Sequence, residues 1–374
     1  MTIVFLKKRV LLTLVPAIFL LFLESCYEKP KSIKIDKEAK IVLLGNNLGA
    51  RMMHYGSFET EMHVQYPDYQ LFIRNMADGG NTPGFRPHAG RPSPWAFPGA
   101  EQFQVELAKN SGSEGTFETP DGWLTRLQAD IIISFFGYNE SFAGEAGLEN
   151  YKKELDAFIQ HTLAQKYNGN SVPQLVIVSP IAFQNLTAKY DLPNGQVENT
   201  HLEMYTKAMG EVSGHYPEVK FVDAFNPSKE WYANNKALTI DGAQLNEDGY
   251  QLFAEFLIES VFGEQPKKAE EKRAAIKKAV LKKNYFWHSD YKIPKGVHAF
   301  GRRYQPYGPD NYPFEIQKSR ELTAVRDRLI WATAKGEVFD LAAADAKTVA
   351  VPAIETNYNI NSHATNEQYL YGDD

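Results

Sequence analysis

The stretch KIVLLGNNLGARM, residues 40–52, decides the fold. Its apolar run IVLL is interrupted by Gly45, Asn46 and Asn47, and a helix-like pattern begins two residues later. A buried strand that enters a tight Gly/Asn turn and then a helix is typical of the carboxyl edge of a parallel α/β sheet, where such folds bind ligands. The turn therefore predicts a site, although it contains no serine, cysteine or threonine.

Further apolar runs follow the first, and stretches with helical periodicity separate them. Apolar strands that alternate with helices predict a parallel sheet covered by helices on both faces. We therefore expect a three-layer α/β/α fold with an aromatic-rich C-terminal appendage. The sequence predicts strands at 41–44, 70–75, 131–136, 175–178 and 220–224, and helices at 148–166, 198–212, 247–262 and 315–334.

The composition is that of a globular protein, with 43% hydrophobic and 23% charged residues among 374. A net charge of -6 argues against a general affinity for nucleic acids. The only cysteine, Cys26, excludes an intramolecular disulfide and a cysteine-based metal cluster. The sequence predicts no cofactor and no bound metal.

The first 26 residues combine a basic start, an apolar run at 10–23 and Cys26. They resemble a bacterial lipoprotein signal, in which Cys26 becomes the lipidated first residue of the mature chain. This implies a lipid-anchored protein of the cell envelope, facing the periplasm or attached to the outer membrane. A plain secretory signal peptide and an uncleaved N-terminal anchor are the alternatives.

The remaining chain divides by composition. The Lys/Glu-rich stretch 265–283 predicts an exposed helix whose charges face solvent, while residues 284–331 have many aromatic and few aliphatic side chains and should pack on the sheet domain. Arg302 and Arg303 either fasten this segment to the sheet domain or bind a carboxylate or sugar. The predicted organisation is a signal peptide at 1–26, a tether at 27–39, a sheet domain at 40–263, an appendage at 264–334 and an extended tail at 335–374.

Four turns carry the candidate chemistry: GNNL at 45–48, GGNT at 79–82, GYNE at 137–140 and DGAQ at 241–244. In this order and at these spacings they resemble the blocks of the SGNH (GDSL) hydrolase superfamily, over residues 41–262. The resemblance implies a flavodoxin-like sheet and an ester hydrolase ancestry.

The superfamily's first block holds a nucleophilic serine, and its last block, Asp-x-x-His, holds the base. The resemblance places Asn47 at the nucleophile position, Gln244 at the base position and Asp241 as the residue that orients the base. Gly80 and Asn139 match the donors of the oxyanion hole. An amide side chain cannot supply an attacking alkoxide, and it does not gain or lose a proton at neutral pH. Loss of a nucleophile or base costs about a million-fold in kcat, so the hydrolytic site is predicted to be degenerate.

Three further residues are candidates for substrate binding: Asn46, Glu140 and His88. Glu140 or His88 would also have to act as a substitute base if water replaced the serine. His88 fits an ordinary loop histidine as well. Asn139 and Asp241 equally fit simple turn-capping roles.

A second resemblance concerns the blocks GNNLGARM, FFGYNESFAG and LAQKYNGNSVPQLVIVSPIA together with residues 284–331. They are similar to the N-terminal region of large secreted proteins of Planctomycetes and related bacteria. In those proteins an SGNH-like domain precedes a sugar-dehydrogenase-like propeller and a c-type haem domain. The resemblance implies a setting in carbohydrate metabolism, although the sequence contains no Cys-x-x-Cys-His motif.

These observations leave three hypotheses. The first is a lipid-anchored SGNH-type ester hydrolase-like protein that acts on acylated glycans through a degenerate site. The second is a non-catalytic module of the same fold that binds a glycan or a protein. The third is a structural partner of a haem-containing dehydrogenase.

Overall fold

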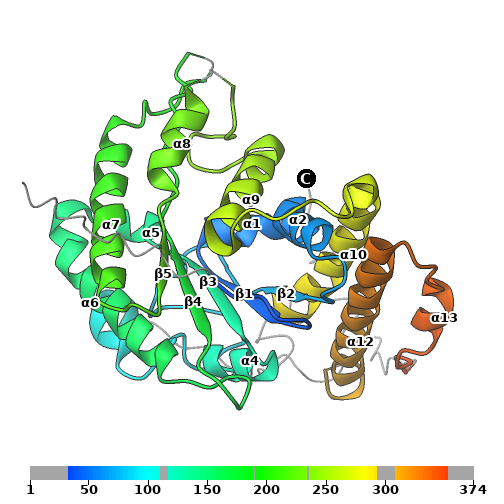
Figure 1. The fold of residues 1–374 in the computed structure, drawn as a ribbon. Helices are drawn as coiled ribbons and strands as arrows, with labels where there is room; N and C mark the ends of the chain where they lie inside the picture. The colour runs from blue at the N-terminus through cyan, green and yellow to red at the C-terminus, as the bar shows by residue number, and fades with distance from the viewer. Residues whose placement is uncertain are drawn as a thin grey trace, which may run out of the picture. The chain divides into compact units, whose positions relative to one another are not determined.

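The computed structural model describes residues 33–88, 90–109, 117–188, 190–233, 236–292 and 308–352. The predicted signal sequence with Cys26, most of the predicted tether, and Arg302 and Arg303 lie outside these residues. Within the described residues, five parallel strands form one sheet in the order β2-β1-β3-β4-β5 (Figure 1). The strands are β1 (Lys40–Gly45), β2 (Phe72–Asn75), β3 (Ile131–Phe135), β4 (Gln174–Val178) and β5 (Lys220–Val222).

This strand order is the flavodoxin-like, doubly wound arrangement. The register pairs Leu43 of β1 with Ile133 of β3 and with Asn75 of β2, and all neighbouring strands run parallel. The predicted parallel α/β/α fold is therefore confirmed. The chain order turns back beside β1, so the crevice expected to bind ligands lies at the carboxyl ends of β1 and β3.

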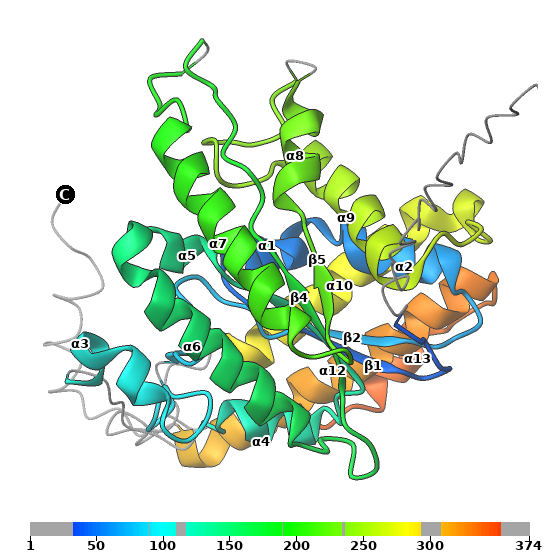
Figure 2. The same cartoon turned by 60° about the vertical axis from the view of Figure 1, so that its left-hand side comes forward.

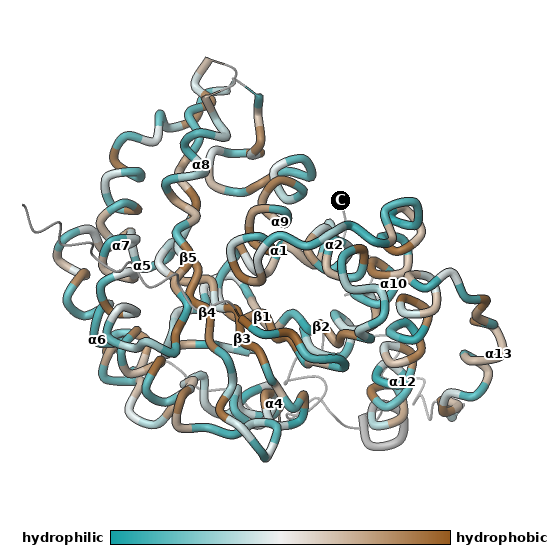
Figure 3. Tube along the Cα trace, viewed as in Figure 1, coloured by the Kyte–Doolittle hydropathy of each residue, from teal (hydrophilic) through white to brown (hydrophobic). Residues whose placement is uncertain are grey.

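Helices cover both faces of the sheet (Figure 2), and alternate residues of β1 pack into two different cores. Ile41 and Leu43 belong to a core shared with α1, α2 and α9, whereas Val42 and Leu44 belong to a core shared with α4, α6 and α7. Both faces are covered, and β1, β3 and β4 are accordingly mostly apolar, as their hydropathy shows (Figure 3), whereas β2 contains Arg74 and Asn75. These helices are α1 (Asn47–Tyr55), α2 (Ser57–Gln65), α4 (Pro120–Arg126), α6 (Gly144–Leu163), α7 (Gln196–Gly214) and α9 (Glu247–Phe262).

Short helices fill the connections, and a helical pair closes the β2 edge of the sheet. The short elements are α3 (Val105–Ala108), α5 (Tyr138–Ser141), α8 (Phe225–Tyr232) and two 3₁₀ turns, Ala100–Phe103 and Glu270–Lys272. The pair consists of α10 (Arg273–Tyr291) and α12 (Gly308–Lys335), which lie side by side next to β2 and α2 (Figure 1).

Side-chain donors of the helical pair reach backbone carbonyls of the sheet domain. Trp287 Nε1 donates to the carbonyl of Asn75 at 2.7 Å, and Trp331 Nε1 donates to the carbonyl of Leu71 at 3.0 Å. Both indoles thus combine apolar packing with a satisfied N–H, which is how buried tryptophans are usually accommodated. The contacts place the described part of 284–331 on the sheet domain.

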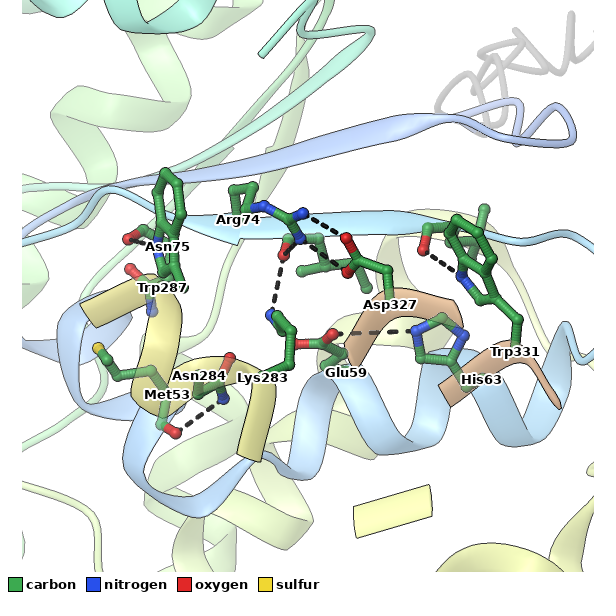
Figure 4. Close-up of polar contacts among 12 residues, drawn as sticks. Met53, Glu59, His63, Arg74, Asn75, Lys283, Asn284, Trp287, Asp327 and Trp331 are labelled. Carbon is green, nitrogen blue, oxygen red and sulfur yellow. Dashed lines mark hydrogen bonds and ion pairs between the residues drawn. The ribbon is translucent and has the colours of Figure 1, made fainter. Parts of the chain in front are cut away.

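A buried ionic layer, formed by Glu59, Arg74, Lys283 and Asp327, lies between α2, β2 and the helical pair (Figure 4). Lys283 Nζ donates to Glu59 Oε2 at 2.7 Å and to the carbonyl of Ile73 at 2.9 Å. Arg74 forms a bidentate pair with Asp327, whose Nη1–Oδ1 distance is 3.0 Å. The expectation that the charges of 265–283 face solvent is therefore wrong for Lys283, whose side chain is only 1% exposed.

The reason for that error is the position of α2. All nine of its residues are buried, including Glu59, Glu61 and His63, because α9 and α10 both pack against it. A carboxylate in such a place needs a cation beside it, and α10 supplies one. Sequence periodicity alone cannot reveal a partner that lies 224 residues away.

Two predicted boundaries also need correction. Ile33 and Ala39 are buried, and the N–H of Ile33 donates to the carbonyl of Val261 at 3.2 Å, so residues 33–39 belong to the sheet domain and not to a free tether. The tail from 335 is not extended throughout, because α13 (Leu341–Ala346) is helical and Asp340 caps it. Residues 353–374 lie outside the described residues. No helix in the described ranges is long and apolar enough to cross a membrane.

Candidate functional site

The turn after β1 presents Asn47 at the carboxyl edge of the sheet. Gly45 has φ +115°, and a Cβ there would lie 2.1 Å from the carbonyl oxygen of Phe135, so only glycine permits this approach. Asn46 is the N-cap of α1, and its Oδ1 accepts the N–H of Leu48 at 3.3 Å. Asn47 is therefore the first residue of a helix that begins at the strand end.

The turn before α9 fixes the side chain of Gln244. Asp241 Oδ2 accepts Gln244 Nε2 at 2.8 Å, while Asp241 Oδ1 accepts the backbone N–H groups of Ala243 at 2.9 Å and Gln244 at 2.7 Å. The carboxylate of Asp241 thus holds the side chain of Gln244, three residues later, by a hydrogen bond. The Asp-x-x-His resemblance implies the same arrangement for a histidine. Here it orients an amide.

Asn47 and Gln244 line one cleft together with Asn46. The cleft has a volume of about 50 Å³ and lies where the first and last of the four turns meet. Amide groups can donate and accept hydrogen bonds at the same time. The other lining residues are Leu48, Arg51, Tyr138, Pro180, Ile181, Ala243 and Tyr250.

Gly80 and Asn139 lie near this cleft but do not line it. Asn47 Oδ1 is 3.6 Å from the position that a Cβ on Gly79 would take, so the first and second turns approach each other. Asn139 Nδ2 donates to the carbonyl of Asn81 at 3.0 Å, which ties the third turn to the second. One hydrogen of this amide is therefore used as a tether, and the N–H of Gly80 makes no hydrogen bond among the described residues.

Glu140 points under its own turn and not into the cleft. Its Oε2 accepts the N–H of Gly137 at 2.8 Å, and its Oε1 is buried without a partner in the described part of the chain. Burial, helped by the nearby Glu154, raises the pKa of Glu140 to about 8. In this structure Glu140 satisfies an N–H of its own turn, and its substrate-binding role stays a prediction.

His88 also lies outside the set of cleft-lining residues. Its Nε2 is 3.0 Å from the carbonyl of Tyr291, its Nδ1 accepts the N–H of Gly90 at 3.2 Å, and its ring stacks on Phe117. Burial and the neighbouring Arg91 lower the pKa of His88 to about 4. In this structure the imidazole of His88 joins the loop that precedes α3 to α10, and its binding role stays a prediction.

The residue that the sequence analysis missed is Arg51. It lies four positions after Asn47, so both side chains occupy the same face of α1. Its Nη2 donates to the hydroxyl of Tyr55 at 3.1 Å. The i, i+4 spacing from Asn47 was the available signal.

The cleft contains no group suited to nucleophilic or base catalysis at neutral pH. Among its described lining residues there is no Ser, Thr, Cys, His, Asp or Glu. Burial raises the pKa of Tyr250, whose hydroxyl donates to the carbonyl of Leu48 at 2.9 Å, and burial also raises the pKa of Tyr138. No group of three or more His, Cys, Asp or Glu in the described ranges is placed to hold a metal ion.

Solved structures with a similar fold include three lipases or esterases. A protein described as a GDSL-like lipase from Parabacteroides merdae is 16% identical, with a TM-score of 0.43, and the match covers 63% of this chain and 100% of that one. An acetylxylan esterase from Geobacillus stearothermophilus is 11% identical, with a TM-score of 0.41 and coverage of 61% and 96%. A lipase from a goat rumen metagenome is 11% identical, with a TM-score of 0.38 and coverage of 60% and 98%.

No protein-family model matches the chain, and no curated protein sequence matches it. The fold assignment rests on the strand order and register described above.

Proposed function

We propose that this protein is a non-hydrolytic ligand-binding member of the SGNH type, whose cleft binds an acylated or acidic carbohydrate. The observation that carries the proposal is the pair Asn47 and Gln244 in one cleft, with Gln244 held by Asp241. The scaffold that would orient a base is present, but it holds an amide that cannot accept a proton at neutral pH. A site with hydrogen-bonding amides and no nucleophile is suited to binding a carbonyl, a hydroxyl or an oxyanion.

Hydrolysis by water with Glu140 as base is the competing proposal. Its support is weak, because the Glu140 carboxyl is hydrogen-bonded to Gly137 and does not line the cleft. A general base must come within hydrogen-bonding reach of the water that it activates. His88 has the same difficulty, since backbone groups occupy both of its ring nitrogens.

The test compares turnover with binding. Wild-type protein is assayed for release of p-nitrophenol from p-nitrophenyl acetate and of acetate from acetylated xylan, and in parallel for binding of acetylated xylo-oligosaccharides by calorimetry. We expect no turnover above buffer, and binding that Asn47→Ala weakens. Turnover by the wild type that disappears in Glu140→Gln would replace the proposal by the water mechanism.

We also propose that the protein acts at the cell envelope, anchored through a lipid on Cys26, and that a haem-containing dehydrogenase is its partner. The lipoprotein-like start of the sequence supports the anchor, and the resemblance to planctomycete secreted proteins supports the partner. Cys26→Ala should move the protein from the membrane fraction to the soluble fraction. An unchanged distribution would contradict lipid anchoring.

A further inference from the structure

Arg51 is an arginine of the cleft that has no carboxylate partner among the described residues. Its Nη2 donates to the hydroxyl of Tyr55 at 3.1 Å, and its guanidinium lies 5.9 Å from the centre of that ring. Arg74 and Arg326, which are similarly enclosed by protein, each form a bidentate pair with an aspartate. Arg86 and Arg91 are buried without a carboxylate partner as well, but backbone carbonyls accept their N–H groups. Arg51 has neither a carboxylate nor a carbonyl partner among the described residues.

Other unpaired donors lie at the same wall of the cleft. Asn46, which is 1% exposed, has an Nδ2 without any acceptor in the described residues, and Arg51 Nε is in the same situation. Both belong to the first turns of α1, a nine-residue helix that has no acidic residue in its first turn. The positive end of the helix dipole therefore adds to the charge of Arg51 at this wall.

No carboxylate among the described residues accepts a hydrogen bond from these donors. Asp241 lies two residues before the lining Ala243, and its two oxygens already accept three N–H groups from residues 243 and 244. Burial, followed by the charges of Asp241 and Glu198, raises the pKa of Tyr138, but neither acid lines the cleft. The lining thus holds one cation, several donors and no anion.

We propose that the ligand of this cleft carries a carboxylate, which pairs with Arg51 at the N-terminal end of α1. This inference rests on the proposed non-hydrolytic function and specifies its ligand. The cleft volume of about 50 Å³ admits a small group such as a carboxylate, with the rest of the ligand outside it. A sugar acid and a free organic acid share this chemistry, and a planar carboxylate matches the fork of a guanidinium.

The test uses the full chain and isothermal titration with four probes: sodium glucuronate, sodium acetate, inorganic phosphate and neutral glucose. Glucuronate and glucose differ at one carbon, which is a carboxylate in the first and a hydroxymethyl group in the second. We expect glucuronate to bind at least tenfold more tightly than glucose, and less tightly as salt concentration rises. Binding of acetate as well would identify the carboxyl group itself as the recognised feature, whereas a requirement for glucuronate would identify a sugar acid.

Variants locate the carboxylate. Arg51→Gln should weaken glucuronate binding at least tenfold, and Arg51→Lys should retain part of it because the charge remains. The matched control is Arg126→Gln, which removes an exposed guanidinium of α4 that pairs with Glu118 and does not line the cleft, and it should bind as the wild type does. Thermal unfolding of each variant shows whether Arg51→Gln is folded; Arg51→Lys provides the comparison if it is not.

The outcomes separate this inference from the proposed function. Equal binding of glucose and glucuronate, tighter binding of phosphate than of either carboxylate, or wild-type affinity in Arg51→Gln would overturn the carboxylate assignment. Binding of neutral acetylated xylo-oligosaccharide without turnover would still support the proposed function in those cases. Ester turnover would instead refute the proposed function, and absence of binding by every probe would refute the carboxylate assignment.

Discussion

The cleft and the buried ionic layer are two polar regions of the same chain. They differ in whether their charged side chains are paired with carboxylates. In the layer, Lys283 and Arg74 each meet a carboxylate of a distant segment at hydrogen-bonding distance. In the cleft, Arg51 and the Nδ2 of Asn46 meet no acceptor of comparable charge within the described residues. Asn46 and Lys283 are each only 1% exposed, so burial alone does not explain the difference.

The difference separates the polar groups that stabilise the fold from those that lack a partner. A buried pair whose geometry is complete fixes how helices dock, and removing one member leaves an uncompensated charge. Donors left without partners lower stability and persist where a ligand or solvent supplies the missing acceptor. The layer is therefore a structural feature, and the cleft is the region that we propose for binding.

The largest expected effect tests the layer. Lys283→Ala should lower the free energy of unfolding by about 3–5 kcal/mol, because Glu59 then stays buried without its cation. The matched control is Lys277→Ala on the same helix, whose partner Glu247 is 67% exposed, and it should cost about 1 kcal/mol or less. Urea denaturation measures the free energy of unfolding of both variants.

Equal losses in Lys283→Ala and Lys277→Ala would show that the layer is no more important than a surface pair. A double variant, Glu59→Leu with Lys283→Met, should recover much of the stability that Lys283→Ala loses.

The next prediction sharpens the description of the cleft. Asn47→Ser combined with Gln244→His should rebuild a serine–histidine–aspartate relay, because Asp241 already holds the side chain at 244. The double variant should hydrolyse p-nitrophenyl acetate about a hundredfold faster than either single variant, since nucleophile and base act as a unit. A folded double variant that stays at background would show that catalysis was lost through more than these two positions. The tether from Asn139 to Asn81 would then be the first feature to examine.

A smaller effect depends on pH and returns to the layer. His63 is buried beside Glu59, and burial followed by the charge of Lys283 lowers its pKa to about 3. As pH falls below about 6.5, the unfolded chain takes up a proton at His63 and the folded chain does not. The free energy of unfolding should therefore fall with decreasing pH between about 6.5 and 3, with a contribution from His63 of up to about 1.4 kcal/mol per pH unit.

The variant His63→Gln should flatten this part of the pH dependence, measured by urea denaturation between pH 4 and 7. His215→Gln, at an exposed position, is the control and should leave the pH dependence as in the wild type. An unchanged slope in His63→Gln would mean that this histidine is protonated in the folded protein.

The sequence by itself determined the sheet and the chain positions of the site. Short apolar runs that end in Gly/Asn turns specify buried parallel strands, because strands covered on both faces need mostly apolar side chains. The resemblance of the four turns to the SGNH blocks predicts Asn47, Asp241 and Gln244 as neighbours, and the Gly/Asn turns at the ends of parallel strands predict the edge of the sheet where they lie. These features depend on local pattern, and local pattern is what a sequence displays.

Only the tertiary structure decided the partners of the polar side chains. Glu140 and His88 have the residue types of a site, but one carboxyl turned under its own helix and one imidazole stacked on Phe117. The sequence pattern places Lys283 on a solvated face, but α10 packs against α2 and buries this side chain. Arg51 fits an ordinary helix position in the sequence, and only the structure shows that no acidic side chain pairs with it among the described residues. Such assignments depend on which segments meet across more than two hundred residues, and on the cost of burying a charge at that meeting point, neither of which a linear pattern contains.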